Sequence, residues 1–349
     1  MEEKRNMRVI SLDDNRSFKK TFLRWEWMLV LLFIAVNVMN ISISENYLNA
    51  KNLASTMKVF LDKGIVAVTM SMVLLLGEID ISVGSMMALS GTVMGFVGSK
   101  GGSFVEIILA GLIVGALCGL FNGVLIVKFP ELSSTIITLA NQIFFRGIAY
   151  VILENRAYAD YPDAVKFLSW GDLGGIPFIL IFFIIEVLVV SYLVHFTKFG
   201  RSLYAMGRNN LASFYSGIKT NRIKVIVFML NGIAAAIASM FLISKLASAR
   251  ASMAKNYDMD IIAMVILGGV SVSGGKGSVP GVALAVFIIG LLRYGLGLIN
   301  VASETLMIIV GMMLIVLVAI PNFKEFCRES GLQKLFAIKP KKLIEAKKD

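Results

Sequence analysis

The sequence predicts an all-α membrane protein, a polytopic bundle of about ten transmembrane helices that is interrupted by two glycine-rich helix breaks. Three observations indicate this class. Of the 349 residues, 57% are hydrophobic and only 16% are charged, whereas soluble domains are roughly 45–50% apolar and about 25% charged. The apolar residues gather in segments close to the ~20 residues that a helix needs to cross a bilayer. Basic residues gather in a few of the segments between them. A water-soluble globule is therefore excluded.

A backbone in lipid must satisfy its own hydrogen bonds, so an apolar segment crosses the membrane as a helix. Ten segments have the composition of such helices. The third and the eighth are short, and each borders a glycine-rich stretch. We predict the spans Trp25–Ile43, Val59–Leu76, Ser82–Val97, Phe104–Val127, Ser133–Leu153, Pro177–Phe196, Ile223–Leu246, Asp260–Ser273, Val279–Leu298 and Glu304–Ile320.

The charges outside these spans predict the orientation, since cytoplasmic loops carry an excess of lysine and arginine. Residues 1–24 contain seven basic and four acidic side chains, residues 197–224 contain six basic and no acidic ones, and residues 321–349 contain eight basic and four acidic ones. The loop 154–176 has four acidic and two basic residues. We expect a cytoplasmic N-terminal segment 1–24, a membrane domain 25–320 with a cytoplasmic loop at 197–224, and a basic cytoplasmic tail 321–349. The net charge of +11 is then an orientation signal, and no nucleic-acid partner is expected.

Few residues could carry covalent chemistry. The chain has two cysteines, Cys118 and Cys327, and a single histidine, His195. This composition provides no disulfide framework, no multi-thiolate metal site and no histidine pair for zinc. We expect no catalytic residue, no metal site and no cofactor bound by this chain.

Two acidic residues lie inside an apolar stretch, where L-G-E-I-D-I-S-V-G-S runs from Leu76 to Ser85. A charged group at membrane depth costs at least ~2.5 kcal/mol on insertion scales, so it survives where it lines a cavity, a partner helix or water. Glycines permit a break in the helix, whose free backbone groups protein or water can hold. The candidate functional residues of this first break are Gly77, Glu78, Asp80, Ser82 and Gly84.

A second break is predicted at Leu267–Gly275, where L-G-G-V-S-V-S-G-G matches residues 76–84 at four of nine positions. Paired interruptions in two halves of a membrane protein indicate the central site of a transporter. We therefore place both breaks on a translocation path, the second through Gly268, Gly269, Gly274 and Gly275. The neighbouring string G-G-K-G-S at 274–278 lacks the spacing G-x-x-x-x-G-K-[ST] of a Walker A motif, so any ATP must be bound and hydrolysed by another chain.

Other polar residues fall inside the predicted spans. Asn141, Gln142 and Arg146 share one helical flank, and we predict that they face the same polar passage. Asn122 and Asn231 are interpreted as interhelical hydrogen-bond partners. Three glycines at four-residue spacing instead predict a close-packed helix face; they are Gly111, Gly115 and Gly119.

The loop at 200–224 contains a short amphipathic segment between two basic strings. We expect Asn210 to cap a helix that runs to Ser216 and is ended by Gly217. Its apolar side consists of Leu211, Phe214 and Tyr215. Such a helix either lies on the lipid surface or docks its apolar side into a groove of a cytoplasmic partner.

Three motifs carry a family resemblance: L-G-E-I-D-I-S-V-G-S, the loop G-R-S-L-Y-A-M-G-R-N-N-x-A-x-x-x-S-G-I, and V-I-L-G-G-V-S-V-S-G-G-K-G-S-V-P-G. In this order they resemble the ribose-type permease subunits of ATP-binding-cassette sugar importers, within the branched-chain amino acid/sugar permease superfamily. The similarity extends from about Asn52 to Pro321. Glu78 departs from the family string G-G-I-D-L-S-V-G, which has glycine there, and this puts the local substrate preference or the shape of the break in doubt.

The resemblance implies a multi-pass permease of a bacterial plasma (inner) membrane with both termini in the cytoplasm. It implies three kinds of protein partner: a second permease copy or sister permease, two cytoplasmic ATPase subunits that bind ATP and Mg, and an extracytoplasmic sugar-binding protein. The loop would be the segment that couples to the ATPase, through Arg201, Arg208, Asn210, Ala212, Ser216 and Gly217.

We therefore expect a transport subunit and not an enzyme. It would give a monosaccharide or a related sugar-like ligand a path across the membrane by alternating access, driven by the ATPase partners. The alternative is an ion-coupled secondary transporter in which Glu78 and Asp80 carry protons or sodium. An intramembrane enzyme has little support, because no constellation of His, Cys and Ser residues is visible.

Overall fold

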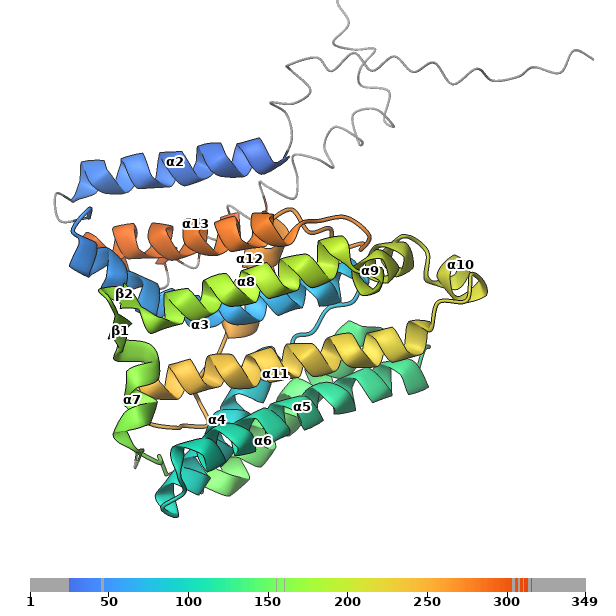
Figure 1. Ribbon diagram of the computed structural model, residues 1–349, viewed down its shortest axis with the longest axis horizontal. Coiled ribbons are helices and arrows are strands. Elements are labelled where there is room, and N and C mark those ends of the chain that lie inside the picture. Colours follow the sequence, from blue (N-terminus) through green and yellow to red (C-terminus); the bar gives the residue numbers. More distant parts are fainter. Residues whose placement is uncertain are drawn as a thin grey trace, which may run out of the picture.

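The computed structural model describes residues 25–315, except 45, 46, 155, 160, 303, 304, 307, 310, 313 and 314. Long helices dominate this part of the chain and run roughly parallel to one axis (Figure 1). They are α2 (Trp25–Ile43), α3 (Ala50–Leu75), α4 (Val83–Ser99), α5 (Phe104–Lys128), α6 (Ser134–Leu153), α7 (Asp163–Trp170), α8 (Phe178–Phe196), α9 (Lys198–Arg208), α10 (Asn210–Tyr215), α11 (Thr220–Leu246), α12 (Tyr257–Leu267) and α13 (Val279–Leu298). A two-residue antiparallel hairpin joins α7 to α8, formed by β1 (Asp172–Leu173) and β2 (Ile176–Pro177).

Eight of the ten predicted spans correspond to helices. The span Asp260–Ser273 is helical only to Leu267, where α12 ends, and the tenth, Glu304–Ile320, lies largely outside the described residues. Six helices of the described part are long and apolar enough to cross a membrane: α2, α5, α6, α8, α11 and α13. Helix α4 is apolar but shorter, and α12 has only 11 residues. The class of an all-α membrane protein is confirmed, whereas the count of about ten spans stays a prediction.

Helix α3 is the centre of the bundle. Every residue from Gly64 to Leu75 is buried, because α8, α11, α12 and α13 all pack against this helix. A helix that is apolar all round lies in a protein core or in lipid, and in this part of α3 the neighbouring helices cover every face. The end of α3 is therefore held firmly at the point where the first break begins.

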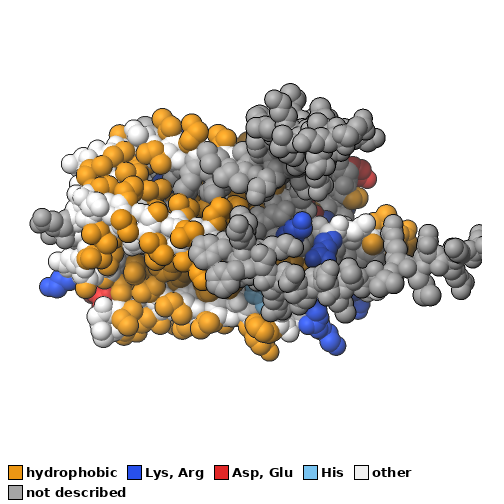
Figure 2. All heavy atoms as spheres, turned by 90° about the horizontal axis from the view of Figure 1, so that it is seen from above, with side chains coloured by type: hydrophobic (Ala, Val, Ile, Leu, Met, Phe, Trp, Pro, Cys, Tyr) orange, Lys and Arg blue, Asp and Glu red, His pale blue; other side chains and the backbone are white. Residues whose placement is uncertain are grey.

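The outer helices present apolar side chains to their surroundings. Ile143 on α6, Leu188 on α8 and Ile113 on α5 are 71%, 64% and 57% exposed. Hydrophobic side chains spread over much of the described surface, and the Lys and Arg side chains gather mainly toward the right, the direction in which α9 and α10 lie (Figure 2). Such a broad apolar surface is the one expected to face lipid.

Helices α5 and α11 approach closely along the predicted glycine face. A Cβ atom on Gly115 would lie 2.4 Å from the carbonyl oxygen of Gly232, and one on Gly119 would lie 2.2 Å from that of Phe228. Gly111 faces α4 instead. The interpretation of this stripe as a close-packed face is confirmed, since no larger side chain fits at either contact with α11.

The loop at 197–224 differs from the expectation in two respects. Lys198–Arg208 forms helix α9, where a basic string without helix was expected. The cap of α10 is Asn209 and not Asn210, because the Asn209 side chain accepts a hydrogen bond from the Ala212 N–H at 2.9 Å. With two consecutive asparagines, the sequence pattern placed this boundary one residue late. Gly217 has a φ of +85° just beyond the helix, as expected of a residue that ends one.

Candidate functional site

Both predicted breaks are irregular segments at the end of the molecule where α9 and α10 lie (Figure 1). Break 1 consists of residues 76–82, between α3 and α4, and break 2 consists of residues 268–278, between α12 and α13. The two are far apart in the sequence, and the fold brings them into contact with each other.

The two breaks begin with the same backbone turn. In break 1 the N–H groups of Gly77 and Glu78 donate back to the last turn of α3, and in break 2 those of Gly269 and Val270 donate to the last turn of α12. Gly77 and Gly269 have φ angles of +77° and +87°, the conformation of a glycine that ends a helix in a Schellman motif. The sequence match paired Gly77 with Gly268. The backbone pairs it with Gly269, so that alignment was wrong by one residue at this turn.

Side chains of α6 hold the backbone of break 1. Ser134 Oγ accepts a hydrogen bond from the Ile79 N–H at 3.1 Å, and Thr138 Oγ1 accepts one from the Ile81 N–H at 3.2 Å. These donors would otherwise be unpaired inside the protein, which is costly. Sequence reasoning missed both α6 residues, because a single serine or threonine in an apolar helix is ordinarily unremarked.

Asp80 is fully buried and joins three elements. Its Oδ1 accepts hydrogen bonds from Ser82 N at 2.9 Å and Ser82 Oγ at 2.7 Å, with Asn122 Nδ2 of α5 at 3.5 Å. Its Oδ2 accepts one from Asn231 Nδ2 of α11 at 3.0 Å. Asn122 in turn accepts a hydrogen bond from Asn141 of α6 at 2.7 Å. Asn122 and Asn231 are thus interhelical partners, as interpreted from the sequence, and their partner is the break.

The residues of the flank predicted on α6 lie in different surroundings. Asn141 belongs to the Asp80 network, and Gln142, half-buried beside it, is not among the residues that this network joins. Arg146 lies further along α6, where its guanidinium donates to the carbonyl oxygens of Ala251 and Met253, both at 2.6 Å, and to Ser85 Oγ at 3.2 Å. Arg146 therefore ties α4 and α6 to the segment between α11 and α12.

Gly84 lies in the first turn of α4, next to this arginine. A Cβ atom there would lie 2.6 Å from the carbonyl oxygen of Ala254 and 3.7 Å from the Arg146 guanidinium. Gly268, at the start of break 2, is equally tight: its Cβ would lie 2.5 Å from Cα of Val282 in α13. Both glycines allow a close approach of two backbones.

Glu78 has a different environment from Asp80. Its carboxylate forms an ion pair with Lys224 of α11, and each of these side chains is 15% exposed. A cavity of about 520 Å³ lies against this pair, bounded by break 1, the connection between α5 and α6, and the starts of α10 and α11. The two carboxylates of break 1 therefore have different roles: Asp80 holds the break by hydrogen bonds, and Glu78 lines the cavity.

Break 1, break 2 and the end of α9 meet at one junction. The Gly275 N–H donates to the carbonyl oxygen of Leu75 at 2.9 Å. A Cβ atom on Gly207 would lie 2.0 Å from that same oxygen and 2.3 Å from Gly275 N. A Cβ on Gly274 would lie 2.7 Å from Gly77 N. Four glycines thus allow three backbones to touch. Gly207 was not among the residues predicted from the sequence, although it stands in the quoted loop motif.

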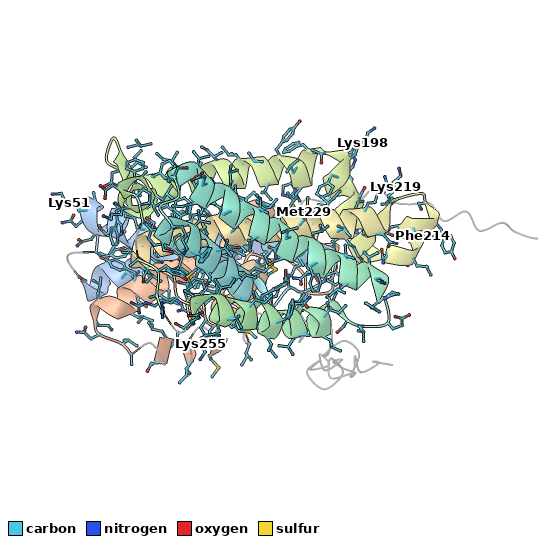
Figure 3. The ribbon with its side chains drawn as sticks, turned by 90° about the horizontal axis from the view of Figure 1, so that it is seen from below. Lys51, Lys198, Phe214, Lys219, Met229 and Lys255 are labelled. Carbon is cyan, nitrogen blue, oxygen red and sulfur yellow. The ribbon has the colours of Figure 1, made fainter. Side chains whose placement is uncertain are left out.

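The predicted coupling residues lie on the surface of α9, of α10 and of the turn that follows α10. Arg201, Arg208, Asn210, Ala212, Ser216 and Gly217 are all exposed. On α10 the apolar side chains project outward, with Leu211, Phe214 and Tyr215 exposed by 66%, 57% and 79%. Figure 3 shows Phe214 at this end of the molecule together with Lys198 and Lys219.

A buried ion-pair network near the other end was not predicted. Asp260 pairs with Lys63 of α3 and Arg293 of α13, both at 2.5 Å, and Asp62 pairs with Lys245 at 2.7 Å. The signal was present as the adjacent charges Asp62 and Lys63 inside the predicted span Val59–Leu76, but their partners Lys245 and Asp260 lie 183 and 197 residues away in the sequence. The network joins α3, α11, α12 and α13.

Comparison with known proteins agrees with this architecture. The model of the family described as branched-chain amino acid transport system / permease component matches residues 52–318. The chain belongs to this permease family. It is therefore a transport subunit and not an enzyme.

The alignments with known relatives extend over most of this chain and nearly all of each relative. The ribose import permease protein RbsC of Escherichia coli (strain K12) is 32% identical over 324 residues, which are 91% of this chain and 100% of the relative. RbsC of Bacillus subtilis (strain 168) is 35% identical over 84% of this chain and 91% of its own length. The autoinducer 2 import system permease protein LsrD of Klebsiella pneumoniae is 31% identical over 86% and 92%. No solved structure matches the chain.

Proposed function

We propose that this permease is the membrane-spanning subunit of an ATP-binding-cassette importer that carries a monosaccharide or a related sugar-like ligand across the bacterial inner membrane. The names of its relatives, which are import permeases for ribose or autoinducer 2, support the cargo class. Its partners would be a second permease, two cytoplasmic ATPase subunits that bind ATP and Mg, and an extracytoplasmic sugar-binding protein. Both termini would lie in the cytoplasm.

The observation that carries the proposal is the glycine junction, where α9 touches break 2 and the end of α3 that leads into break 1. The backbones are in direct contact, with no space between them. A displacement of α9 would therefore also displace Leu75 at the end of α3 and Gly275 in break 2. The end of α3 is buried among neighbouring helices, so the junction is suited to convert a movement at the surface into a movement of the path.

The surface of α10 supplies the docking side of this mechanism. An exposed helix with Leu211, Phe214 and Tyr215 on its outside fits a hydrophobic groove of an ATPase subunit. The basic and small residues around it would fix the register: Arg201, Arg208, Asn210, Ala212, Ser216 and Gly217. Binding of ATP to the partner would then move α10 and α9 together.

An ion-coupled secondary transporter is not favoured. That mechanism requires a carboxylate that is free to take up and release an ion. Asp80 accepts hydrogen bonds from Ser82 and Asn231, and Glu78 is paired with Lys224. Asp80 is fully buried, and Glu78, although it lines a cavity, already has a cationic partner in this conformation.

Vesicles reconstituted with the permease, its ATPase and its binding protein test the proposal. Labelled D-ribose is the first probe, and other monosaccharides follow it. We expect uptake that requires both ATP and the ATPase. Uptake that persists without the ATPase in vesicles with a proton or sodium gradient would overturn the proposal.

The variant Gly207→Ala tests the coupling route itself. Its Cβ would meet the Leu75 carbonyl oxygen, so the junction must separate. We expect the ATPase to co-purify and to hydrolyse ATP as before, while uptake falls roughly fivefold or more, the effect of losing about 1 kcal/mol of coupling. Ser202→Ala, on the same helix but outside the junction, is the control and should transport normally. Normal uptake by Gly207→Ala would remove the junction from the mechanism.

A further inference from the structure

The cavity of about 520 Å³ beside break 1 has the size of a small-molecule site. It lies at the end of the molecule that carries α9 and α10, which the proposed orientation places in the cytoplasm. One wall is break 1 with the start of α6, and the opposite wall is formed by the starts of α10 and α11. A molecule in this cavity would touch both the break and the coupling segment.

The lining favours one class of ligand. Its polar side chains include Glu78, Glu131, Ser134, Asn210, Asn221 and Lys224. Carboxylate, hydroxyl, amide and ammonium groups together offer both donors and acceptors, as the hydroxyl groups of a sugar require. These residues include two carboxylates and one ammonium group, a net negative charge, so the cavity disfavours a sugar that carries a phosphate. The chemistry fits a neutral polyhydroxy compound.

We propose that this cavity is a second binding site for the free sugar, reached from the cytoplasm, through which the accumulated product slows its own import. The inference rests on the proposed function. A sugar here would bridge Glu78 or Ser134 on one wall and Asn210 or Asn221 on the other. Bridging stabilises the conformation in which the walls have their present separation, and a ligand that prefers one conformation of a cycle holds the protein in it.

The ion pair between Glu78 and Lys224 links the cavity to the junction. Lys224 lies in the second turn of α11, directly after α10, and Glu78 follows Gly77 of the junction. A sugar hydroxyl that binds either side chain competes with or extends this pair. Occupancy therefore acts on the same two elements that the ATPase must move.

Direct binding is measured with the full chain in lipid nanodiscs and without the ATPase. Equilibrium dialysis with labelled D-ribose should show saturable binding, and ribose 5-phosphate should bind at least about tenfold more weakly. The double variant Glu131→Leu/Asn221→Leu removes two polar groups at the cavity without touching the break. We expect it to weaken D-ribose binding about tenfold, the effect of one or two lost hydrogen bonds.

The matched control is Lys219→Leu, an exposed residue of the same loop that does not line the cavity; it should bind like the wild type. A second variant, Asn221→Trp, fills the cavity and should abolish binding. It tests the proposal independently if the double variant fails to fold. Undiminished binding by both cavity variants would overturn the proposal, because the sugar would then bind elsewhere.

The effect on transport is measured in reconstituted vesicles that are loaded with unlabelled D-ribose. We expect internal sugar to slow ATP-driven uptake by the wild type and by Lys219→Leu, and to have little effect on the double variant. If no uptake occurs in empty vesicles, the proposed function fails. If empty vesicles transport normally but internal sugar has no effect on the wild type, only this inference fails.

Discussion

Asp80 shows how one buried carboxylate can organise an irregular segment. Both of its oxygens accept hydrogen bonds, from Ser82 on one side and Asn231 on the other. Because every neighbour that it contacts is a donor, the site matches a carboxylate and not an amide. The charge is tolerated inside the bundle because it is surrounded by groups that solvate it.

We expect Asp80→Asn to lower both stability and uptake. The new amide NH₂ must face Asn231 or Ser82, and a buried donor opposite a donor costs about 1–3 kcal/mol. The melting temperature of the detergent-solubilised permease should fall, and uptake should fall with it while membrane expression is retained. Thermal unfolding and transport by the same preparation check this.

The swap Asp80→Asn/Asn231→Asp is the matched test. It moves the carboxylate across the hydrogen bond and lets the amide introduced at position 80 donate to it, so more than half of the lost stability should return. A single variant with wild-type stability and transport would mean that Asp80 is not the anchor of break 1.

At the scale of elements, the α5–α11 contact makes a sharp prediction. Gly119→Ala places a Cβ 2.2 Å from the carbonyl oxygen of Phe228, so the helices must separate. Such overpacking typically costs about 1–3 kcal/mol. Gly147→Ala on α6 is the control, because nothing lies within 4 Å of its Cβ.

Thermal unfolding in one detergent compares the two variants. The melting temperature should fall for Gly119→Ala and stay near that of the wild type for Gly147→Ala. Equal melting temperatures would contradict the close packing of the stripe.

The helices were predictable from the sequence where an apolar segment is long enough to cross a membrane. The C-terminal end of α2 and both ends of α13 were predicted to the residue, since a long apolar run in lipid has no alternative to a helix. Helix α9 was missed because its basic residues made Lys198–Arg208 look like a loop. Nothing in a hydrophobicity pattern distinguishes a polar helix outside the bilayer from a polar coil.

The candidate site was predictable in its parts but not in its contacts. The acidic residues and glycines of break 1 stand out in an apolar stretch, as does the second glycine string. That Gly275 donates to the Leu75 carbonyl oxygen, and that Gly207 touches both, depends on how segments far apart in the sequence fold together. The ion pair of Glu78 with Lys224 is of the same kind. A single sequence carries no record of such pairs.

For the whole molecule, the two ends differ in charge. The end with α9, α10 and the start of α11 carries Lys198, Arg201, Arg208, Lys219, Arg222 and Lys224 (Figure 3). The opposite end carries α7 and the β hairpin, where Asp163 pairs with Lys166 and Asp172 pairs with Lys58, so basic and acidic charges balance there. The positive-inside rule therefore predicts that the α9 end faces the cytoplasm, as in the proposed function. The same prediction places the junction and the cavity on the cytoplasmic side.

Cysteine labelling tests this orientation. In a Cys327→Ser background, where Cys118 remains buried, Lys198→Cys and Asp163→Cys place single exposed thiols at the two ends. A maleimide that cannot cross membranes should label Lys198→Cys only in inside-out vesicles and Asp163→Cys only in right-side-out vesicles. The opposite pattern would place α9 and α10 outside, where no ATPase could reach them, and would overturn the coupling route together with the cytoplasmic sugar site.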